Sequence, residues 1–344
     1  MGAVNAIEME RSVAHGDVIL EVEDLVKYFP LRRGIGQALR REPELAVKAV
    51  DGVSFNVKKG ELFGVVGESG CGKTTMGRTI LRLLEPTDGR VTFEDIDVTA
   101  LSTEQLKQLR TRMQIIFQDP YESMNPRLDV HRIIAEPLRI QGMVNNAREA
   151  LPHIEKALED VEMTPPEEYL YRYPHELSGG QRQRIAVARA LVLDPEFIVA
   201  DEPVSMLDVS IRGEILNLML DLSRERGVTF LYITHDLATA RHICDRIAVM
   251  YLGKMVEKGP TDSLVKHPLH PYTRALIGAV FVPDPTRKGF GKVLKGEVPS
   301  PVDPPSGCRL HPRCPVARDI CKEVEPEPTE ADDGHMVACH FALG

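Results

Sequence analysis

The stretch "GESGCGKTT" (Gly67–Thr75) decides the fold of this chain. It follows an apolar run, "LFGVV", and leads into "MGRTILRLL", which has the apolar spacing of a helix. The pattern Gly-x4-Gly-Lys-[Ser/Thr] is that of a phosphate-binding loop, in which glycines let backbone amides point inward at phosphate oxygens. The start of a helix adds partial positive charge at the same place. The stretch therefore predicts a nucleotide site between a buried strand and a helix.

Each residue of this loop has an expected role. Gly67, Gly70 and Gly72 allow the backbone to curl around the phosphates. The Lys73 ammonium should reach the β- and γ-phosphates, and the Thr74 hydroxyl should bind Mg²⁺. The other loop residues that we expect at the nucleotide are Glu68, Ser69, Cys71 and Thr75.

An acidic pair lies at the end of another apolar run. In "FIVADEP" (Phe197–Pro203), four apolar residues are followed by Asp201 and Glu202. A buried strand that ends in aspartate can hold Mg²⁺ through the carboxylate, and the next acidic residue can accept a proton from an attacking water. An ordinary acidic turn is the alternative, and the phosphate-binding loop upstream argues against it.

A second anion-binding helix start is predicted in "LSGGQRQR" (Leu177–Arg184). Ser178, Gly179 and Gly180 place small, amide-rich residues at the first turn of a helix, where anions bind. A lone serine in that position is more often a simple helix cap. One nucleotide needs only one phosphate-binding site in a chain. The second predicted anion site therefore suggests that this helix start acts on a nucleotide bound by another copy of the protein.

Strand-like and helix-like segments alternate along most of the chain. Val18–Leu25 alternates apolar and polar residues as a half-buried strand does, whereas "LFGVVG", "FIVAD" and "TFLYIT" are continuous apolar runs. Buried strands separated by helices predict an α/β fold with a mainly parallel sheet covered on both faces. The polar segment Arg32–Lys48 is expected to be a loop. Only helical patterns occur between about residues 121 and 190, and proline and glycine accumulate from Val282 onward, which predicts a loop-rich tail.

The composition excludes several classes of protein. The chain has 344 residues, of which 43% are hydrophobic, enough for a sizeable core. Its formal net charge of −9 does not favour non-specific binding of nucleic acid. No apolar run approaches the roughly 18 residues that span a bilayer, and residues 1–17 lack the apolar segment of a signal peptide. We therefore expect a cytoplasmic protein, in which disulfide bonds are rare.

Taken in this order, the motifs resemble those of the ATP-binding-cassette (ABC) ATPases over about residues 18–262. The resemblance implies a parallel-sheet core with the phosphate loop, an antiparallel β subdomain and a helical subdomain at about residues 121–190. It implies ATP and Mg²⁺ as ligands and hydrolysis of ATP to ADP and phosphate. Residues 1–17 are then an N-terminal extension, and residues 263–344 are a C-terminal extension with four cysteines.

The same resemblance implies roles for individual residues. Tyr28 in "LVKYF" is similar to the aromatic residue that stacks on adenine, and Gln118 in "QIIFQDP" to the glutamine that contacts Mg²⁺ and the attacking water. Ser178–Gln181 resembles the signature that closes on the partner's ATP, and His235 in "YITHD" resembles the switch histidine near the γ-phosphate. The alternatives are core packing for Tyr28 and ordinary strand-end hydrogen bonding for His235. By the same resemblance, Asp201 is a Mg²⁺ ligand and Glu202 is the general base. Asp208 belongs to the loop that crosses the dimer interface, and in this loop the chain has Met206 where a small residue is usual.

Three further stretches resemble the ATPases of bacterial and archaeal oligopeptide and dipeptide importers: Phe117–Arg127, His267–Ile277 and Gly296–Cys321. The resemblance implies peptide uptake, with nickel, glutathione or a sugar as alternative solutes. It implies two transmembrane permease subunits, a second ABC ATPase subunit that is identical or related, and an extracytoplasmic substrate-binding protein. The chain is then expected at the cytoplasmic face of the membrane, and nucleic acid is not an expected partner.

A soluble ABC ATPase of translation or DNA repair is the less favoured alternative. Such proteins usually carry two cassettes in tandem or a long coiled-coil insertion. This chain has one phosphate loop and one signature, about 100 residues apart.

Four of the six cysteines lie in the tail, with 5, 6 and 17 residues between them: Cys308, Cys314, Cys321 and Cys339. Structural zinc sites prefer a pair of ligands separated by two to four residues, and no such pair occurs here, although nearby histidines keep zinc open. Four thiolates suit an iron–sulfur cluster, and the tail resembles that of peptide-importer ATPases that bind a [4Fe–4S] cluster. We expect the cluster first, zinc second and free thiols third. We also expect the cluster to close the tail into one compact lobe at the end of the ATPase domain. We expect no direct part in hydrolysis, because the tail is remote in sequence from the ATP motifs.

Overall fold

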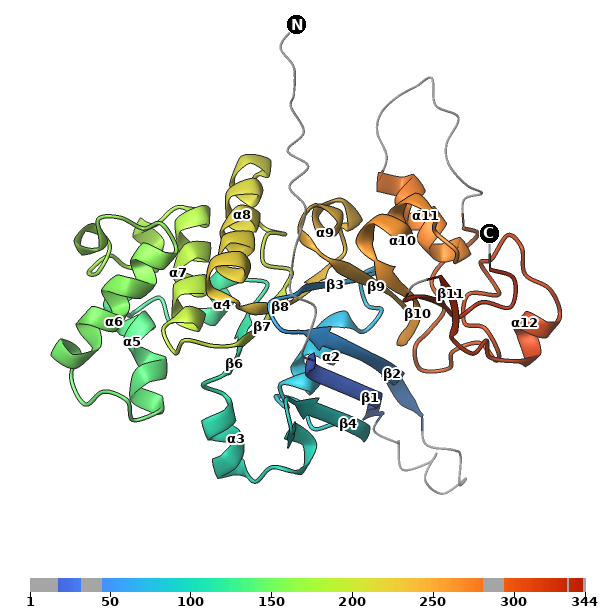
Figure 1. Cartoon of the computed structure of the whole chain (residues 1–344), viewed down its shortest axis with the longest axis horizontal. Helices are drawn as coiled ribbons and strands as arrows, with labels where there is room; N and C mark the ends of the chain where they lie inside the picture. Colours follow the sequence, from blue (N-terminus) through green and yellow to red (C-terminus); the bar gives the residue numbers. More distant parts are fainter. Residues whose placement is uncertain (1–17, 32–44, 281–293, 333, 343–344) are drawn as a thin grey trace, which may run out of the picture.

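The described part of the chain has two β-sheets near its centre, a lobe of helices on one side and the tail on the other (Figure 1). The N-terminal extension expected at residues 1–17 lies outside it, as does most of the loop expected at Arg32–Lys48. This computed structural model describes residues 18–31, 45–280, 294–332 and 334–342.

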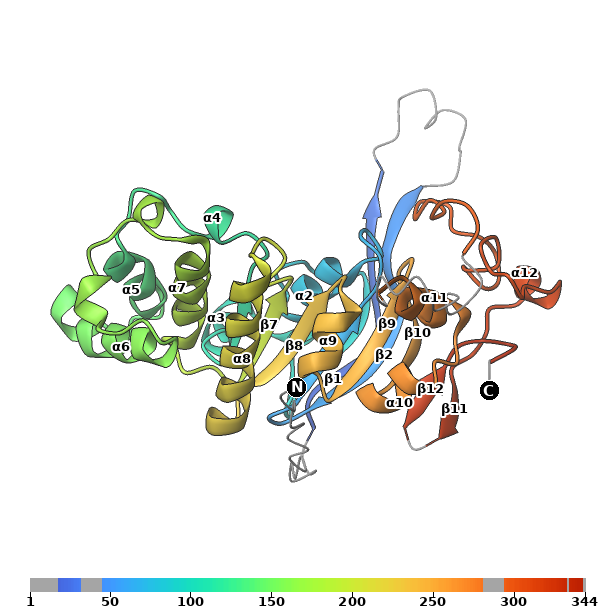
Figure 2. The same cartoon turned by 90° about the horizontal axis from the view of Figure 1, so that it is seen from above.

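The smaller sheet is antiparallel throughout, as the resemblance implies. Its strands lie in the order β2-β1-β4-β5. The long strands β1 and β2 run side by side and extend beyond the edge of the larger sheet (Figure 2). The bounds are Val18–Pro30 for β1, Ala46–Lys58 for β2, Asp88–Phe93 for β4 and Ile96–Asp97 for β5.

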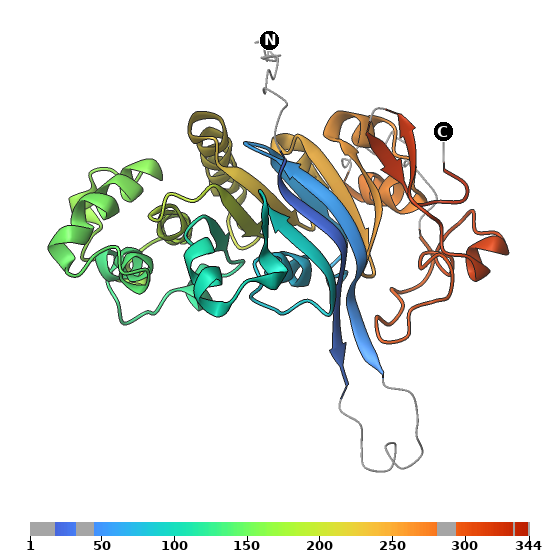
Figure 3. The same ribbon diagram turned by 60° about the horizontal axis from the view of Figure 1, so that its bottom comes forward.

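The larger sheet has the strand order β11-β12-β10-β9-β3-β8-β7-β6. All pairs from β9 to β6 are parallel, which confirms the predicted parallel core. The pairs among β11, β12, β10 and β9 are antiparallel. Strands β4, β1 and β2 lie across one face of this sheet (Figure 3). The bounds are Leu62–Val66 for β3, Met113–Ile116 for β6, Phe197–Asp201 for β7, Thr229–Thr234 for β8, Arg246–Tyr251 for β9, Lys254–Pro260 for β10, Thr329–Asp332 for β11 and His335–Val337 for β12.

Burial on both faces of the larger sheet explains the continuous apolar runs. In β8, Phe230 and Tyr232 belong to a hydrophobic core shared with the helices, whereas Leu231 and Ile233 belong to a core shared with the smaller sheet. All four side chains are fully buried. Successive residues of a strand point to opposite faces, so a strand that is covered on both faces carries apolar side chains at successive central positions.

Residues 121–190 form helices and no strand, as the sequence pattern predicts. Asp129 and Asn146 begin two of these helices by accepting hydrogen bonds from backbone N–H groups of the first turn. Within the described residues, no helix combines the length and the apolar character that crossing a bilayer requires. The lobe contains α4 (Pro120–Ser123), α5 (Val130–Ile140), α6 (Ala147–Asp160), η2 (Pro166–Glu168), η3 (Pro174–Glu176) and α7 (Gly179–Leu191).

The remaining helices connect the strands of the sheets. Helix α2 follows β3 and packs between the two sheets, where Met76 and Ile80 are fully buried. The helices outside the lobe are α2 (Lys73–Ile80), η1 (Val98–Ala100), α3 (Thr103–Leu109), α8 (Val209–Arg226), α9 (Leu237–Ile243), α10 (Thr261–Lys266), α11 (Pro271–Val280) and α12 (Ile320–Glu323).

The tail joins the larger sheet. Strand β12 pairs with β10 and extends the sheet at one edge. Leu310 is almost fully buried in the hydrophobic core that the larger sheet shares with the helices. Val337 on β12 is buried as well. Apart from α12, β11 and β12, the described tail residues from 294 onward form no helix or strand, which agrees with their proline and glycine content. The tail is therefore built onto the sheet that carries the nucleotide motifs.

Candidate functional site

A cavity of about 530 Å³ opens where the phosphate-binding loop meets three strand ends of the larger sheet. Ser69, Gly70, Gly72, Lys73, Thr74 and Thr75 line it on the loop side. Three predicted residues from elsewhere in the sequence line it as well, namely Gln118, Glu202 and His235. The other lining residues are Phe29, Val47, Ala49 and Pro301.

The loop Gly67–Thr75 has the curled backbone that its glycines predict. Gly72 has a φ of 109°, in the left-handed region that favours glycine, and a Cβ atom there would lie 1.9 Å from the carbonyl oxygen of Ala49. The buried Lys73 ammonium donates to the carbonyl oxygens of Gly67 and Glu68, at 2.7 and 3.1 Å. Helix α2 begins at Lys73, so the loop and the start of the helix both face the cavity.

Two oxygen ligands suited to Mg²⁺ meet at the edge of the cavity. The Thr74 hydroxyl donates a hydrogen bond of 2.8 Å to the Asp201 carboxylate at the end of β7. Burial raises the pKa of the Asp201 carboxyl above its ordinary value, and the hydrogen bond from Thr74 acts in the opposite direction. Hydroxyl and carboxylate oxygens are the ligands that Mg²⁺ prefers. The pair therefore fits the predicted metal position beside the phosphates.

Two predicted residues, Gln118 and His235, converge on the carboxylate of a third, Glu202. Gln118 Nε2 donates to Glu202 Oε2 at 3.2 Å, and His235 Nδ1 lies 3.0 Å from the same oxygen. They follow β6, β7 and β8, which are neighbours in the sheet. Ligands bind at the carboxyl edge of parallel strands, where such loops meet. Residues far apart in the sequence are thereby brought together at the cavity.

The backbone at Glu202 is held in an uncommon conformation. Its φ is 47°, in the left-handed region that a residue with a side chain adopts rarely. Its N–H donates to the carbonyl oxygen of Ile233 at 2.8 Å, which fixes the turn after β7. Strained residues of this kind cluster at functional sites. The turn directs the Glu202 side chain to the cavity rather than along the strand.

The structure does not support the adenine position predicted for Tyr28. The Tyr28 hydroxyl donates to the Asp51 carboxylate, and burial together with Asp51 raises the pKa of Tyr28 to about 12. The neighbouring Phe29 lines the cavity instead. The pairing of β1 with β2 shifts register between Lys27 and Tyr28. Because that bulge breaks the two-residue period of the strand, the sequence alone could not show which of the two rings faces the site.

Three predicted loop residues do not line the cavity with their neighbours. Gly67 packs against the end of β9, where a Cβ atom would lie 2.2 Å from the carbonyl oxygen of Met250. The Cys71 side chain is buried, and burial raises the pKa of its thiol. The Glu68 carboxylate pairs with Arg313 of the tail at 3.0 Å. In contrast, Val47, Ala49 and Pro301 line the cavity although no sequence motif pointed to them.

The signature Ser178–Gln181 begins α7 in the helical lobe and does not line this cavity. The Ser178 hydroxyl accepts from the N–H of Gln181 at 3.2 Å, and the Gln181 side chain accepts from the N–H of Ser178 at 2.9 Å. This is a capping box, so the simple helix cap is part of what these residues do. Nearby, Met206 and Val209 on either side of Asp208 expose 67% and 82% of their surface. These large apolar side chains are open to a partner.

The four tail cysteines gather around one small, mostly apolar cavity. Burial raises the pKa of Cys308 to about 11, and the other three thiols act in the same direction. The cavity measures about 10 Å³, the space of a single water molecule. In the part of the chain that the structure describes, no group of three or more His, Cys, Asp or Glu side chains is arranged to hold a metal ion. The geometry therefore gives the predicted metal cluster no support beyond the proximity of the thiols.

Comparison with known proteins places these features in a family. A family model described as "ABC transporter" matches residues 50–205, and one described as "Oligopeptide/dipeptide transporter, C-terminal region" matches residues 256–321. The chain is similar to the solved ATP-binding cassette MJ0796, a dimer bound to ADP and Pi, with a TM-score of 0.60 and 28% identity over 70% of this chain and 98% of that one. It is also similar to cbiO1 of Clostridium perfringens, part of the ABC transporter complex cbiONQ, with a TM-score of 0.61 and 26% identity over 73% and 92% of the two chains.

A more extensive similarity links the chain to the oligopeptide transport ATP-binding protein AppF of Bacillus subtilis (strain 168). The two chains are 52% identical over 335 residues, which is 96% of this chain and 99% of AppF. With 96% of this chain aligned, the aligned part includes the phosphate loop, the strand ends around Glu202 and most of the tail. Because the identity extends over nearly the whole of both proteins, this chain belongs to the family of ATP-binding subunits of oligopeptide ABC transporters.

Proposed function

We propose that this ATPase drives the uptake of dipeptides and oligopeptides through two separate transmembrane permease subunits, at the cytoplasmic face of the membrane. A second ATPase subunit and an extracytoplasmic substrate-binding protein complete the proposed assembly. The convergence of Gln118 and His235 on Glu202 beside the phosphate loop carries the proposal. The match of residues 256–321 to the oligopeptide/dipeptide transporter region supports peptides over nickel, glutathione or a sugar.

In the proposed reaction, the phosphates of ATP lie on the loop Gly67–Thr75. The Lys73 ammonium turns from its two carbonyl acceptors to the β- and γ-phosphates and neutralises their charge. Thr74, Asp201 and Gln118 would hold Mg²⁺, which neutralises charge on the transferred group. Glu202 accepts the proton of the attacking water, while Gln118 and His235 fix the position of its carboxylate.

The active unit is proposed to be a dimer in which Ser178–Gln181 of one subunit completes the ATP site of the other. In one chain the signature and the cavity are separate, because no residue of Ser178–Gln181 lines the cavity. The exposed Met206 and Val209 give the loop around Asp208 an apolar surface for such a partner. MJ0796, which is similar in fold, is a dimer in its solved structure.

A short segment joins the ATP cavity to the helical lobe. Gln118 lines the cavity, and α4 begins two residues later at Pro120. Tyr121 on α4 exposes 55% of its surface, and the Arg182 guanidinium of α7 lies 4.1 Å from the centre of its ring. We infer that the surface from Tyr121 to Arg127 faces a permease subunit, so that closure around ATP moves the surface that contacts the membrane protein.

The composition of the assembly tests the proposed function. The chain is expected to co-purify from membranes with two multi-spanning permease subunits and a second ATPase subunit. Peptide-loaded binding protein should stimulate ATP hydrolysis by that assembly. Co-purification with ribosomes or DNA-repair proteins and without permeases would contradict the proposal and favour a soluble ATPase.

Replacing Lys73 with alanine should weaken ATP binding by about tenfold or more, because the charge that meets two phosphates is lost. Equilibrium binding of a fluorescent ATP analogue measures this effect. Lys266→Ala is the matched control, because its ammonium lies in an exposed pair with Asp262 and does not line the cavity. Unchanged ATP affinity in a folded Lys73→Ala protein would show that the phosphates bind elsewhere.

We also propose that Cys308, Cys314, Cys321 and Cys339 hold one [4Fe–4S] cluster, with Zn²⁺ as the second candidate. The four thiols share one cavity. Burial and mutual repulsion raise the pKa of Cys308 and disfavour bare thiolates, and a cation among them would reverse that effect. In this structure the cavity is too small for a cluster, so ligation requires the four side chains to move outward.

Protein purified without oxygen should then be brown and contain iron and sulfide in roughly equal amounts. Replacing any one of the four cysteines with serine should remove the colour and lower the thermal stability of the tail. Cys244→Ala is the control, because Cys244 is buried in the main core and does not line this cavity. Colourless protein with one zinc ion would transfer the site to zinc, and metal-free protein with an ordered tail would defeat both assignments.

A further inference from the structure

The tail makes an ion pair with the phosphate loop that the reaction itself does not require. The Arg313 guanidinium contacts both carboxylate oxygens of Glu68, at 3.0 and 3.3 Å. The Arg313 side chain is only 10% exposed, and that of Glu68 is 30% exposed. A two-contact pair between arginine and a carboxylate fixes orientation as well as charge. The contact therefore constrains the second residue of the loop that is to hold the phosphates.

The backbone at Glu68 is held from the same side. The N–H of Glu68 donates to the hydroxyl of Tyr272 on α11 at 2.8 Å. Tyr272 is fully buried, and its ring lies 4.7 Å from that of Tyr251. The Arg313 guanidinium lies 5.8 Å from the centre of the Tyr251 ring. Arg313, Tyr272 and Tyr251 thus form one packed support beneath Glu68, which we call the Glu68 support.

A second part of the tail reaches the other wall of the cavity. Pro301 lines the cavity, and its carbonyl oxygen accepts from the N–H of Lys48 on β2 at 2.9 Å. Arg309 donates to the carboxylate of Asp51, which also accepts the hydroxyl of Tyr28. The C-terminal region therefore touches both the phosphate loop and β2, the strand that pairs with β1 beside Phe29.

We propose that Arg313 and Tyr272 are positioning residues for ATP, which fix the phosphate loop through Glu68 and so make the C-terminal region part of the nucleotide site. The proposal rests on the assignment of Gly67–Thr75 as the phosphate loop. Arg313 has two effects on this loop. It fixes the Glu68 side chain through two contacts, and it neutralises a carboxylate that would otherwise repel the incoming triphosphate.

Replacing Arg313 with alanine should weaken ATP binding at least roughly fivefold, about 1 kcal/mol. The Glu68 carboxylate, next in sequence to the loop residues that line the cavity, then carries an unpaired negative charge. The double variant Arg313→Ala/Glu68→Gln lacks this negative charge. Its ATP affinity should therefore lie within about twofold of that of Glu68→Gln alone. A double-mutant cycle of these variants measures the coupling between Arg313 and Glu68. The KM for ATP should rise more than kcat falls, because the residues act on binding rather than on proton transfer.

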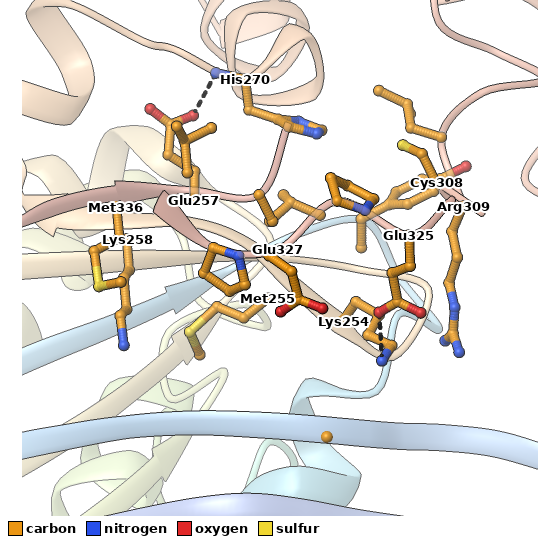
Figure 4. Close-up of a pocket in the computed structure, with 18 of the residues that line it drawn as sticks. Lys254, Met255, Glu257, Lys258, His270, Cys308, Arg309, Glu325, Glu327 and Met336 are labelled. Atoms are coloured by element: carbon orange, nitrogen blue, oxygen red, sulfur yellow. Dashed lines mark hydrogen bonds and ion pairs between the residues drawn. The ribbon is translucent and has the colours of Figure 1, made fainter. Parts of the chain in front are cut away.

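Tyr272→Phe isolates the backbone contact, because it removes the accepting hydroxyl and keeps the ring in its packed place. ATP affinity should fall about threefold, in the range of one neutral hydrogen bond. Glu325→Gln is the matched control for the loss of a tail ion pair. Glu325 contacts Lys254 at 2.7 Å on the rim of a separate cavity between β10 and the tail (Figure 4). That variant should leave ATP affinity unchanged.

Thermal unfolding shows whether Arg313→Ala folds. If it does not fold, the conservative variant Arg313→Lys takes its place in the binding measurement. Arg313→Lys retains the charge and loses the two-contact geometry, so we expect an intermediate ATP affinity. Unchanged affinity in Arg313→Ala, or an equal loss in Arg313→Ala and the double variant, would overturn the proposal. Loss of binding in Lys73→Ala together with normal binding in Arg313→Ala would refute only the Glu68 support. Normal binding in Lys73→Ala would refute the phosphate loop itself.

Discussion

The Glu202→Gln variant should hydrolyse ATP about a hundredfold more slowly than the unmodified protein, or slower still, while it retains ATP binding. Glutamine has the shape of glutamate and can still accept the hydrogen bond from Gln118, but it cannot take a proton from water. Single-turnover and steady-state phosphate release measure the rate. Size-exclusion chromatography with ATP should show a stable dimer, because the bound nucleotide is not consumed.

A matched substitution separates the role of Glu202 from a general effect on β7. Glu196 lies just before the other end of this strand and pairs with Arg112. Glu196→Gln makes the same chemical change away from the cavity and should leave the rate within about twofold, as for a partly exposed ion pair. Near-normal hydrolysis in Glu202→Gln would sink the assignment of the general base.

The Ser178→Arg variant should lose ATP hydrolysis by about a hundredfold or more while the isolated subunit still binds ATP. A bulky cation at the start of α7 blocks the surface that is proposed to cover the partner's nucleotide. Ser102 provides a control, because it caps α3 with the same capping-box geometry, through Gln105. Ser102→Arg removes a cap, at a cost of about 1 kcal/mol in stability, and should not affect the rate.

Mixing two inactive variants tests whether the site is shared between subunits. A mixed dimer of Ser178→Arg and Lys73→Ala has one site in which both the phosphate loop and the signature are intact. Hydrolysis should therefore reappear when the two proteins are combined. If each site were built within one chain, every site in the mixture would be damaged, and no activity would return.

Local patterns in the sequence were sufficient to predict the core of the fold. The apolar runs at β3, β7 and β8 are continuous because both faces of these strands are covered. The motifs at Gln118 and His235 lie directly after strands, so parallel pairing brings them to Glu202. The side of β1 that faces the cavity could not be predicted, because a bulge near Tyr28 reverses the expected alternation.

The role of the tail could not be predicted because its contacts join distant parts of the chain. Arg313 and Glu68 are 245 residues apart, and β12 pairs with a strand about 80 residues before it. Neither contact produces a periodic pattern in the sequence. Distance along the chain from the ATP motifs therefore gave no sign that the C-terminal region lies directly against the phosphate loop.

ATP hydrolysis at Glu202 is proposed to drive peptide transport, and uptake of a labelled peptide is the decisive experiment. The peptide is supplied to vesicles that contain the co-purified assembly and its binding protein. With ATP at the face of the ATPase subunits, we predict that the peptide accumulates with the unmodified chain and does not accumulate with Glu202→Gln. Equal accumulation with both chains, or accumulation of nickel, glutathione or a sugar in place of peptide, would contradict this proposal.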